Sequence, residues 1–282
     1  VLVIEGIHAL DKRVLTNIIN IETGVGRTGK VLFVCTVDPC KLNGTTITRT
    51  GPYNHKEIIE KKIAIGSTVI IKLAGEVIPR IDKVLESDNS LEEFTIPKEC
   101  PFCHSQLVLV KNSLYCPSGL SCSEQLVNSL IHFCSRGGMN IHGLGESYIR
   151  RLVLAEVLKT YSDIFSLTEK DLVSLKDDYD PVENNALLNY RYANKIISNI
   201  QARRVVEYNK FLCALGIPGL GNSACLKYVG KTIEEILDMS KDEHVRRLGI
   251  NTGELAYTYF TTPENNKEIN KLLKIIYIVY TF

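Results

Sequence analysis

The sequence lacks an excess of either charge, a long apolar run and a visible export signal. Its 33 Lys and Arg residues balance 32 Asp and Glu residues, so the formal net charge is +1 and no basic excess indicates a nucleic-acid partner. Any such binding must come from local patches or backbone groups. No run reaches the roughly 18 apolar residues of a membrane span, and no N-terminal segment has the pattern of a signal peptide. The sequence therefore disfavours membrane and secreted proteins.

The composition is that of an ordinary globular chain, with 45% apolar and 23% charged residues. The 282 residues are enough for two or three domains. The chain begins at Val1 rather than Met, which is consistent with a fragment of a longer protein.

Four cysteines have the spacing of a metal site. Two residues separate Cys100 from Cys103, twelve separate Cys103 from Cys116, and five separate Cys116 from Cys122. Two thiolates on a tight turn and a second pair across a short hairpin can supply the four tetrahedral ligands of a structural zinc site. Because four ligands close the coordination sphere, this zinc is expected to hold structure rather than to catalyse. Two disulfides are the alternative, which the CxxC spacing disfavours.

The remaining five cysteines are odd in number and lie in apolar stretches: Cys35, Cys40, Cys134, Cys213 and Cys225. This pattern predicts free, buried thiols in a reducing compartment. We therefore expect a cytoplasmic or nucleoid-associated protein.

Short strands dominate the chain before the cysteines. A glycine-rich turn at 24–29 precedes strands at 30–37, 45–48 and 68–72, and a helix-like segment near 55–61 separates the last two. Several short strands with one interposed helix over about 70 residues favour an OB-type barrel. The turn lacks the strand–GxxxxGK[ST]–helix context of a P-loop. On spacing alone, a tight hairpin turn is the favoured interpretation of it.

After the cysteines the apolar period becomes helical, and an internal repeat is visible. Ile141-His-Gly-Leu-Gly145 leads into a helix at 146–158, and Ile217-Pro-Gly-Leu-Gly221 into one at 222–229. A looser copy, with Gly249, precedes 254–260, and a fourth hairpin is expected near Asn189. Glycine lets a backbone approach a phosphate closely, and helix N-termini favour anions. Ordinary αα corners with glycine caps are the alternative.

Arg191, Arg203 and Arg204 form a local basic patch in the same region. A solvated helix face explains each of them as well as a phosphate contact does. The fold class predicted is thus a multidomain α+β chain with a small barrel, a zinc finger and an all-α region of tandem helix-hairpin-helix motifs.

The order of these parts resembles the NAD-dependent DNA ligases over about residues 12–278. The turn at 24–29 is similar to that family's VGRTG segment, 74–79 to its AGDVIP segment, and the cysteines to its zinc finger. Residues 133–145 are similar to FxSRxAMxIDGLG, which opens the family's helix-hairpin-helix repeats, and 211–217 match FLxALGI. The resemblance implies an OB fold at 21–95, a zinc finger at 96–128 and a DNA-binding helical domain at 129–282. Residues 1–20 would be the tail of a nucleotidyltransferase domain.

The departures concern catalysis. The sequence contains no KxDG motif, which carries the family's adenylated lysine, and no counterpart of its nicotinamide-recognition or BRCT domains. Lys72 and Leu73 replace a basic pair, His142 replaces the Asp of IDGLG, and only Asn54 remains clearly of SNATLHN. We therefore expect a chain without a catalytic residue of its own, inactive alone, which needs NAD and Mg²⁺ only together with upstream or separate adenylating domains.

The resemblance also implies contacts with nicked duplex DNA, of the kind sealed in replication and repair. Arg27 and Thr28, with Gly29, would press on the backbone near the nick, and the zinc module would fix the angle between barrel and hairpins. The hairpin contacts would come from Gly143, Gly145, Asn189, Gly219, Gly221 and Gly249. Two alternatives remain: a stand-alone, non-catalytic duplex-DNA-binding protein derived from a ligase, and an unrelated RNA-binding protein, which would not need the hairpin repeats.

Overall fold

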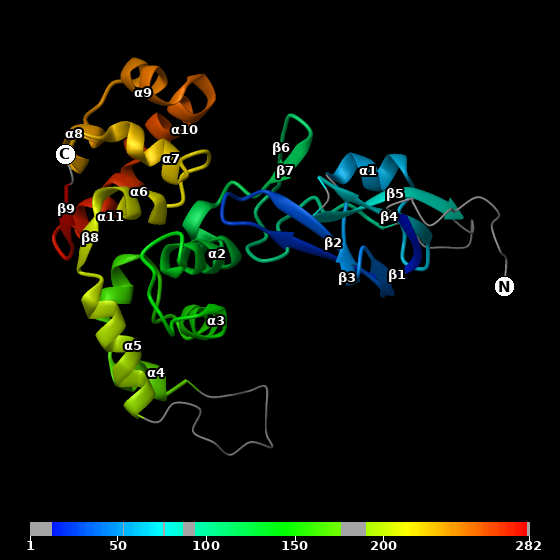
Figure 1. The fold of residues 1–282 in the computed structure, drawn as a ribbon, viewed down its shortest axis with the longest axis horizontal. Coiled ribbons are helices and arrows are strands. Elements are labelled where there is room, and N and C mark those ends of the chain that lie inside the picture. Colours follow the sequence, from blue (N-terminus) through cyan, green and yellow to red (C-terminus); the bar gives the residue numbers. More distant parts are fainter. Residues whose placement is uncertain (1–12, 53, 76, 87–93, 176–189, 281–282) are drawn as a thin grey trace. The chain divides into compact units, whose positions relative to one another are not determined.

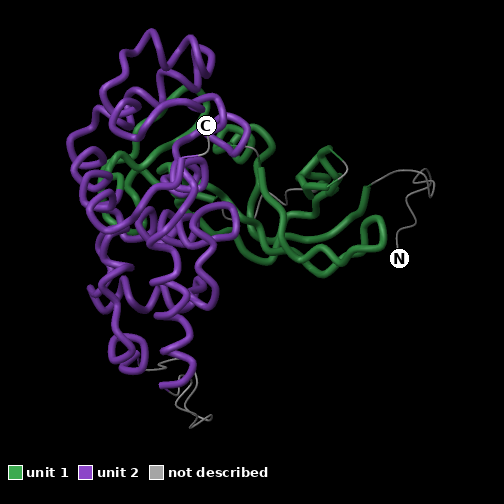
Figure 2. The backbone as a smooth tube through the Cα atoms, turned by 60° about the vertical axis from the view of Figure 1, so that its left-hand side comes forward, with its two compact units in different colours: residues 1–119 green, residues 120–282 purple. Residues whose placement is uncertain are grey.

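Residues 13–52, 54–75, 77–86, 94–175 and 190–280 are described by the computed structural model of the chain. They divide into two units, residues 1–119 and 120–282 (Figure 2). The cysteine segment 100–122 crosses this division in the sequence. Within the described ranges, no helix is both long and apolar enough to cross a membrane.

The first unit is organised around strand β1 (Arg13–Val25), which pairs with two different partners. Residues 13–17 pair antiparallel with β4 (Thr68–Ala74), and residues 18–25 pair antiparallel with β2 (Val31–Leu42). A bulge between Ile18 and Asn20 lies at the start of the pairing with β2, and it lets the sheet bend. The complete strand order is β3-β2-β1-β4-β5, with β3 at Thr45–Thr50 and β5 at Ile78–Glu86.

The two edges of this sheet approach each other, as the barrel prediction requires. Arg80 on β5 donates a 3.0 Å hydrogen bond to the carbonyl of Pro52, just beyond β3. Helix α1 (His55–Glu60) lies between β3 and β4 in the chain, and the Asn54 side chain caps it by accepting from the Glu57 amide at 3.2 Å. Asn54, the residue that remains of the family's SNATLHN segment, therefore has a structural task in the barrel.

The expected boundary between residues 20 and 21 falls inside β1. The strand begins at Arg13, and residues 13–20 are already hydrogen-bonded into the sheet. The buried positions Thr16 and Ile18 alternate regularly, but the next one is Ile21, because the bulge adds a residue. The two halves of the strand therefore have patterns out of phase. The remainder of the expected domain tail, 1–12, lies outside the described residues.

After the barrel strands in the sequence, β6 (Val108–Val110) and β7 (Ser113–Tyr115) form a two-stranded hairpin. It separates the first two cysteines from the last two along the chain. A 3-10 turn at Gly119–Ser121 follows.

Helices make up most of the second unit, shown from green to red in Figure 1. The long ones carry the apolar face of the core, and several short ones connect them. Their bounds are α2 Ser123–Cys134, α3 Glu146–Leu154, α4 Glu169–Val173, α5 Tyr190–Ala202, α6 Tyr208–Ala214, α7 Asn222–Cys225, α8 Ile233–Leu237, α9 Lys241–Leu248, α10 Ile250–Thr261 and α11 Pro263–Leu273, with 3-10 helices at Ser162–Ser166 and Leu226–Tyr228.

One apolar cluster runs through all of this unit, from Leu126 on α2 to Ile278 near the C-terminus. Phe133 is fully buried and stacks on Tyr161, with 4.9 Å between the ring centroids. An aromatic pair of this kind contributes about 0.5–1.5 kcal/mol beyond its buried area. Strand β9 (Tyr277–Val279) pairs in parallel with β8 (Val205–Glu207), and Ile278 is its one residue in the core, since Tyr277 and Val279 are exposed.

Candidate metal centre and nucleic-acid interface

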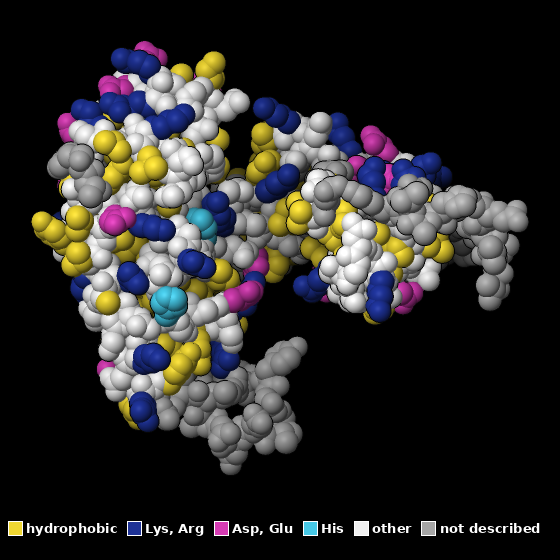
Figure 3. Space-filling view, in the orientation of Figure 1, with side chains coloured by type: hydrophobic (Ala, Val, Ile, Leu, Met, Phe, Trp, Pro, Cys, Tyr) yellow, Lys and Arg dark blue, Asp and Glu magenta, His cyan; other side chains and the backbone are white. Residues whose placement is uncertain are grey.

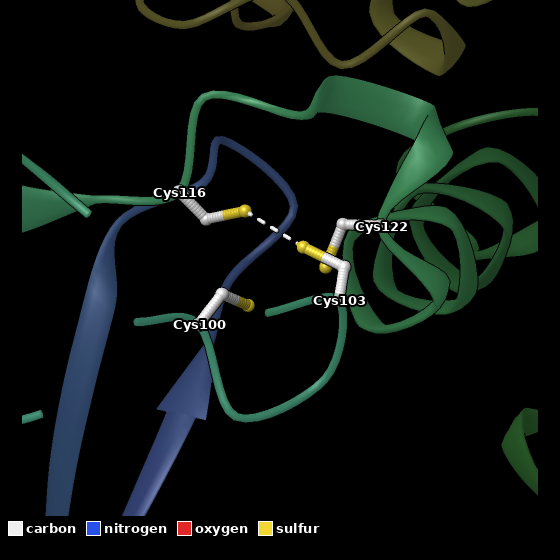
Figure 4. Close-up of side chains that lie close together, drawn as sticks. All are labelled: Cys100, Cys103, Cys116 and Cys122. Carbon is white, nitrogen blue, oxygen red and sulfur yellow. Dashed lines mark hydrogen bonds between the residues drawn. The ribbon is translucent and has the colours of Figure 1, made fainter. Parts of the chain in front are cut away.

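The sulfur atoms of Cys100, Cys103, Cys116 and Cys122 all lie within 4.8 Å of one another (Figure 4). Cys100 and Cys103 flank a tight turn, in which the Cys100 carbonyl accepts from the His104 amide and the Cys100 amide donates to Ser105, both at 2.9 Å. Cys116 follows directly after β7, and Cys122 is the N-cap residue of α2. The predicted ligand set is thus brought together by elements close in the sequence.

This arrangement suits a tetrahedral ion. A metal with bonds of about 2.3 Å to four sulfurs has sulfur–sulfur edges of about 3.8 Å. The Cys103 and Cys116 sulfurs are 3.5 Å apart, and all nine cysteines of the chain are free thiols. A disulfide would need about 2.05 Å. The four cysteines can therefore hold a metal ion.

The polar groups around Cys103 favour its thiolate form. Burial raises the pKa of the Cys103 thiol, but hydrogen bonds with the Ser105 and Ser118 hydroxyls, the Ser105 backbone and Cys116 together outweigh burial and lower the pKa to about 5. These two hydroxyls are 3.4 and 3.5 Å from the Cys103 sulfur and 2.6 Å from each other. A thiolate is the form that binds metals. The cysteine spacing alone does not identify Ser105, whose only signal is its place two residues after Cys103.

The glycine-rich turn of the barrel is a tight hairpin between β1 and β2. The Gly26 amide donates to the Lys30 carbonyl and the Gly29 amide to the Gly26 carbonyl, each at 2.9 Å. Gly29 is buried with a φ of +80°, a conformation that favours glycine. At the tip, Thr28 is exposed and Arg27 is half-buried.

A backbone hydrogen bond joins this turn to the cysteine segment. The Cys116 amide donates to the Gly29 carbonyl at 2.8 Å. Beside it, Lys30 and Tyr115 form an antiparallel bridge. No local sequence pattern indicates this contact, which connects a candidate metal ligand with the turn that carries Arg27 and Thr28.

Two glycine turns of the second unit have nearly the same backbone. Gly143 and Gly219 have φ values of +92° and +80°. Gly145 and Gly221 have φ/ψ of −89°/−178° and −80°/−179°, and each is the N-cap residue of the following helix, α3 or α7. In both turns the two glycines are exposed, while the intervening Leu144 and Leu220 are buried. The repeated motif therefore presents bare backbone to solvent and anchors it by one leucine.

The third candidate turn is related but not identical. Gly249 is the N-cap residue of α10, as Gly145 is of α3, and its carbonyl accepts from the amide four residues later at 2.8 Å. Its φ is +86°, however, and it follows α9 directly. The fourth predicted position, Asn189, lies outside the described residues.

Each of the first two turns packs against a later helix. A Cβ at Gly143 would lie 2.8 Å from Ile196 Cγ1 of α5, and one at Gly219 would lie 2.8 Å from Thr252 Oγ1 of α10. Asn199 of α5 also donates to the His142 carbonyl at 2.8 Å. Gly145 and Gly221, in contrast, have no atom within 4 Å of a built Cβ. Gly143 and Gly219 are therefore needed for packing, whereas Gly145 and Gly221 face open space.

The three arginines of the predicted basic patch lie in different environments. Arg204 has a structural role, since it donates hydrogen bonds to the carbonyls of Phe165 at 2.9 Å and Ile275 at 3.4 Å. Arg191 is exposed at the start of α5, and Arg203 is half-buried at its end. Figure 3 shows Lys and Arg side chains spread over the second unit among polar and apolar ones.

Comparisons with known proteins agree on one family. Residues 15–93 match the family model described as the NAD-dependent DNA ligase OB-fold domain. The DNA ligase of Salinibacter ruber is 32% identical over 273 residues, which are 93% of this chain and 38% of that protein. The DNA ligase of Bacillus subtilis is 32% identical over 272 residues, 94% of this chain and 39% of the relative. That of Geobacter sulfurreducens is 31% identical over 270 residues, again 39% of the relative. The chain spans about two fifths of the length of these relatives.

Proposed function

This chain corresponds to a C-terminal region of the NAD-dependent DNA ligases, and from that premise we propose that it holds nicked duplex DNA for sealing. The barrel and helices would grip the DNA backbone, and a structural Zn²⁺ would occupy the four-cysteine site. Adenylation would be the task of a domain with the KxDG lysine, which these 282 residues do not contain. NAD and Mg²⁺ would act there, in replication and repair.

The observation that carries this proposal is the repeated glycine turn. Gly143–Gly145 and Gly219–Gly221 share backbone angles, exposed glycines and a buried central leucine. A turn that offers bare backbone can approach a phosphate without side-chain hindrance, and it binds DNA without reading the bases. We propose that these turns, with Gly249 and Asn189, belong to tandem helix-hairpin-helix motifs that follow the duplex backbone.

In the barrel, the corresponding proposal concerns Arg27, Thr28 and Gly29. Thr28 is exposed at the tip of the hairpin, and the Arg27 guanidinium beside it is suited to a phosphate. Sealing a nick depends mainly on positioning and on charge stabilisation. The contribution of this turn would be to hold the backbone near the nick, so that its loss would affect sealing rather than adenylation.

A second candidate is a stand-alone, non-catalytic duplex-binding protein. One observation favours it: the Lys72 ammonium, which remains of the family's basic pair, lies 2.6 Å from a carboxylate oxygen of Asp82 on the neighbouring strand β5. Arg13 contacts the same carboxylate at 3.2 Å. The charge of Lys72 is thus partly neutralised by the protein. The reading frame upstream of Val1 decides between the two candidates, since an in-frame KxDG segment is expected for a ligase.

Binding to DNA is the direct test. Fluorescence anisotropy with a labelled duplex that has one central nick, the same duplex without the nick, and the single strand should give the order nicked, intact, single-stranded. Because phosphate contacts dominate, the affinity should fall steeply with salt. Equal, salt-insensitive or absent binding to all three probes would overturn the proposal.

A further inference from the structure

A cavity of about 500 Å³ lies in the second unit, apart from the glycine turns and the cysteines. Segments distant in the sequence form its walls: the residues after α2, the end of α5, strands β8 and β9, and the start of α6. A volume of this size is in the usual range for small-ligand sites. The polar side chains that line it are Arg136, Asn140, Arg203, Glu207 and Lys210.

The charge of the lining is positive. Three cations and one carboxylate give a formal +2, in a chain whose overall net charge is +1. Among the described residues, no ion pair joins Arg136, Arg203 or Lys210 to a carboxylate. Arg203 and Lys210 are half-buried, so they are partly removed from the water that would screen their mutual repulsion. An anion in the cavity would relieve that repulsion.

The chemistry of the lining selects the type of anion. A planar guanidinium donates two parallel hydrogen bonds to a phosphate, and a lysine adds a point charge. Met139, Val205 and Val206 add apolar side chains to the lining. Two arginines and one lysine against a single carboxylate favour a phosphate group.

The position of the cavity indicates the source of that phosphate. Asn140 of the lining precedes Gly143 by three residues, so their Cα atoms are at most about 11 Å apart. A duplex backbone held at Gly143–Gly145 would therefore pass close to the cavity. We propose that this cavity binds a phosphate group of the DNA backbone, beside the contacts of the glycine turn. This inference rests on the proposed DNA binding, and free phosphate compounds are the other source of the same group.

The test uses the full chain and four variants. R136Q/K210Q removes two cations, R136Q alone removes the exposed one with the least risk to folding, and E207Q removes the carboxylate. K267Q/K274Q, on and just after α11, is the matched control, because both lysines lie outside the cavity. Duplex affinity is measured by anisotropy over a range of NaCl concentrations. Inorganic pyrophosphate binding is measured by calorimetry, and circular dichroism checks folding.

We expect R136Q/K210Q to weaken duplex binding about tenfold at low salt and to reduce the slope of log K against log salt by about 0.9, the contribution of the one phosphate contact that the cavity would make. R136Q should give about half of that reduction, E207Q should tighten binding, and the control should match the wild type.

Each other outcome is also decisive. If R136Q/K210Q leaves the duplex slope unchanged but abolishes pyrophosphate binding, the cavity takes free phosphate groups and not the DNA backbone. If neither probe distinguishes the variants from the wild type, the cavity proposal is overturned. If the wild type does not bind duplex DNA at all, the proposed function fails, and the pyrophosphate titration alone decides on the cavity.

Discussion

The backbone amide of Cys116 donates a 2.8 Å hydrogen bond to the carbonyl oxygen of Gly29. One partner is a candidate metal ligand, and the other closes the turn that presents Arg27 and Thr28. The Lys30–Tyr115 bridge extends this pairing by one step on each chain segment. The conformation of the cysteine segment and that of the turn are therefore coupled directly through backbone hydrogen bonds.

Replacing one metal ligand tests the four-cysteine site. C116S should lower the bound zinc from about one ion per chain to a small fraction, because three thiolates leave the tetrahedral set incomplete. Metal analysis of the purified protein measures this stoichiometry, and binding to nicked duplex should weaken in parallel. C40S is the control, since Cys40 lies in β2, outside the cluster. Unchanged zinc content in C116S would argue against the site.

Removing the metal should loosen the Arg27–Thr28 turn. With a chelator, amide hydrogen exchange should accelerate at Gly26, Gly29 and Cys116, whose hydrogen bonds form the connection between turn and cysteine segment. Ile71, in the interior strand β4, should keep its protection. A protein that loses its zinc while the exchange of the turn stays unchanged would show that the two are not coupled.

Neighbouring glycines of one turn should respond differently to alanine. G143A should lower the free energy of unfolding by about 1–3 kcal/mol, because alanine is strained at a φ of +92° and its Cβ would press on Ile196. G145A should cost about 1 kcal/mol or less, since its site is open and its φ is ordinary.

Duplex binding should show the opposite order for G145A, because its methyl group would stand on the exposed backbone of the turn. Denaturant unfolding and duplex titrations of the pair separate the two effects. A G145A protein with wild-type duplex affinity would remove this turn from the proposed interface.

The stability of the second unit should decrease in mild acid because of His244. This fully buried imidazole stacks on Phe260 and lies with Nδ1 2.5 Å from the Tyr228 hydroxyl. Burial lowers the pKa of His244, more than Glu243 raises it, so the unfolded chain binds a proton at a higher pH than the folded one.

Above pH 6.5 the histidine is neutral in both the folded and the unfolded chain, so the free energy of unfolding does not depend on it. As the pH falls from 6.5 towards the folded pKa, the free energy of unfolding decreases by at most about 1.4 kcal/mol per pH unit. Urea unfolding at several pH values measures this slope. H244F, which has no titratable ring, should lose that part of the slope. The same slope in both proteins would contradict the assignment.

Features set by neighbouring residues were predictable from the sequence. The cysteine cluster follows from CxxC spacing and a short hairpin, and the glycine turns follow from a repeated GxG before an apolar helix. Most barrel strands were also found, because each has its own turn signal. The extent of β1 has no simple signal, because its bulge interrupts the alternation of buried residues between Ile18 and Ile21.

Features that depend on pairing at long range were not predictable. Gly29 and Cys116 meet through backbone groups, which leave no trace in residue type. The structural role of Arg204 depends on hydrogen bonds to the carbonyls of Phe165 and Ile275, which are distant in the sequence. The phosphate cavity draws its cations from three separate segments, so no local run of basic residues indicates it. Helices such as α7, with four residues, are too short to give a period.

The parallel pair of β8 and β9 has a consequence for biosynthesis. Val205 pairs with Tyr277, 72 positions later in the chain. At a synthesis rate of 5–20 residues per second, roughly 4 to 14 s separate the emergence of the two strands. During this interval the helices from α6 to α11 can form, but β8 has no partner. The second unit therefore completes its core only after Tyr277 has emerged, and a nascent chain stopped before Tyr277 exposes an unpaired strand edge.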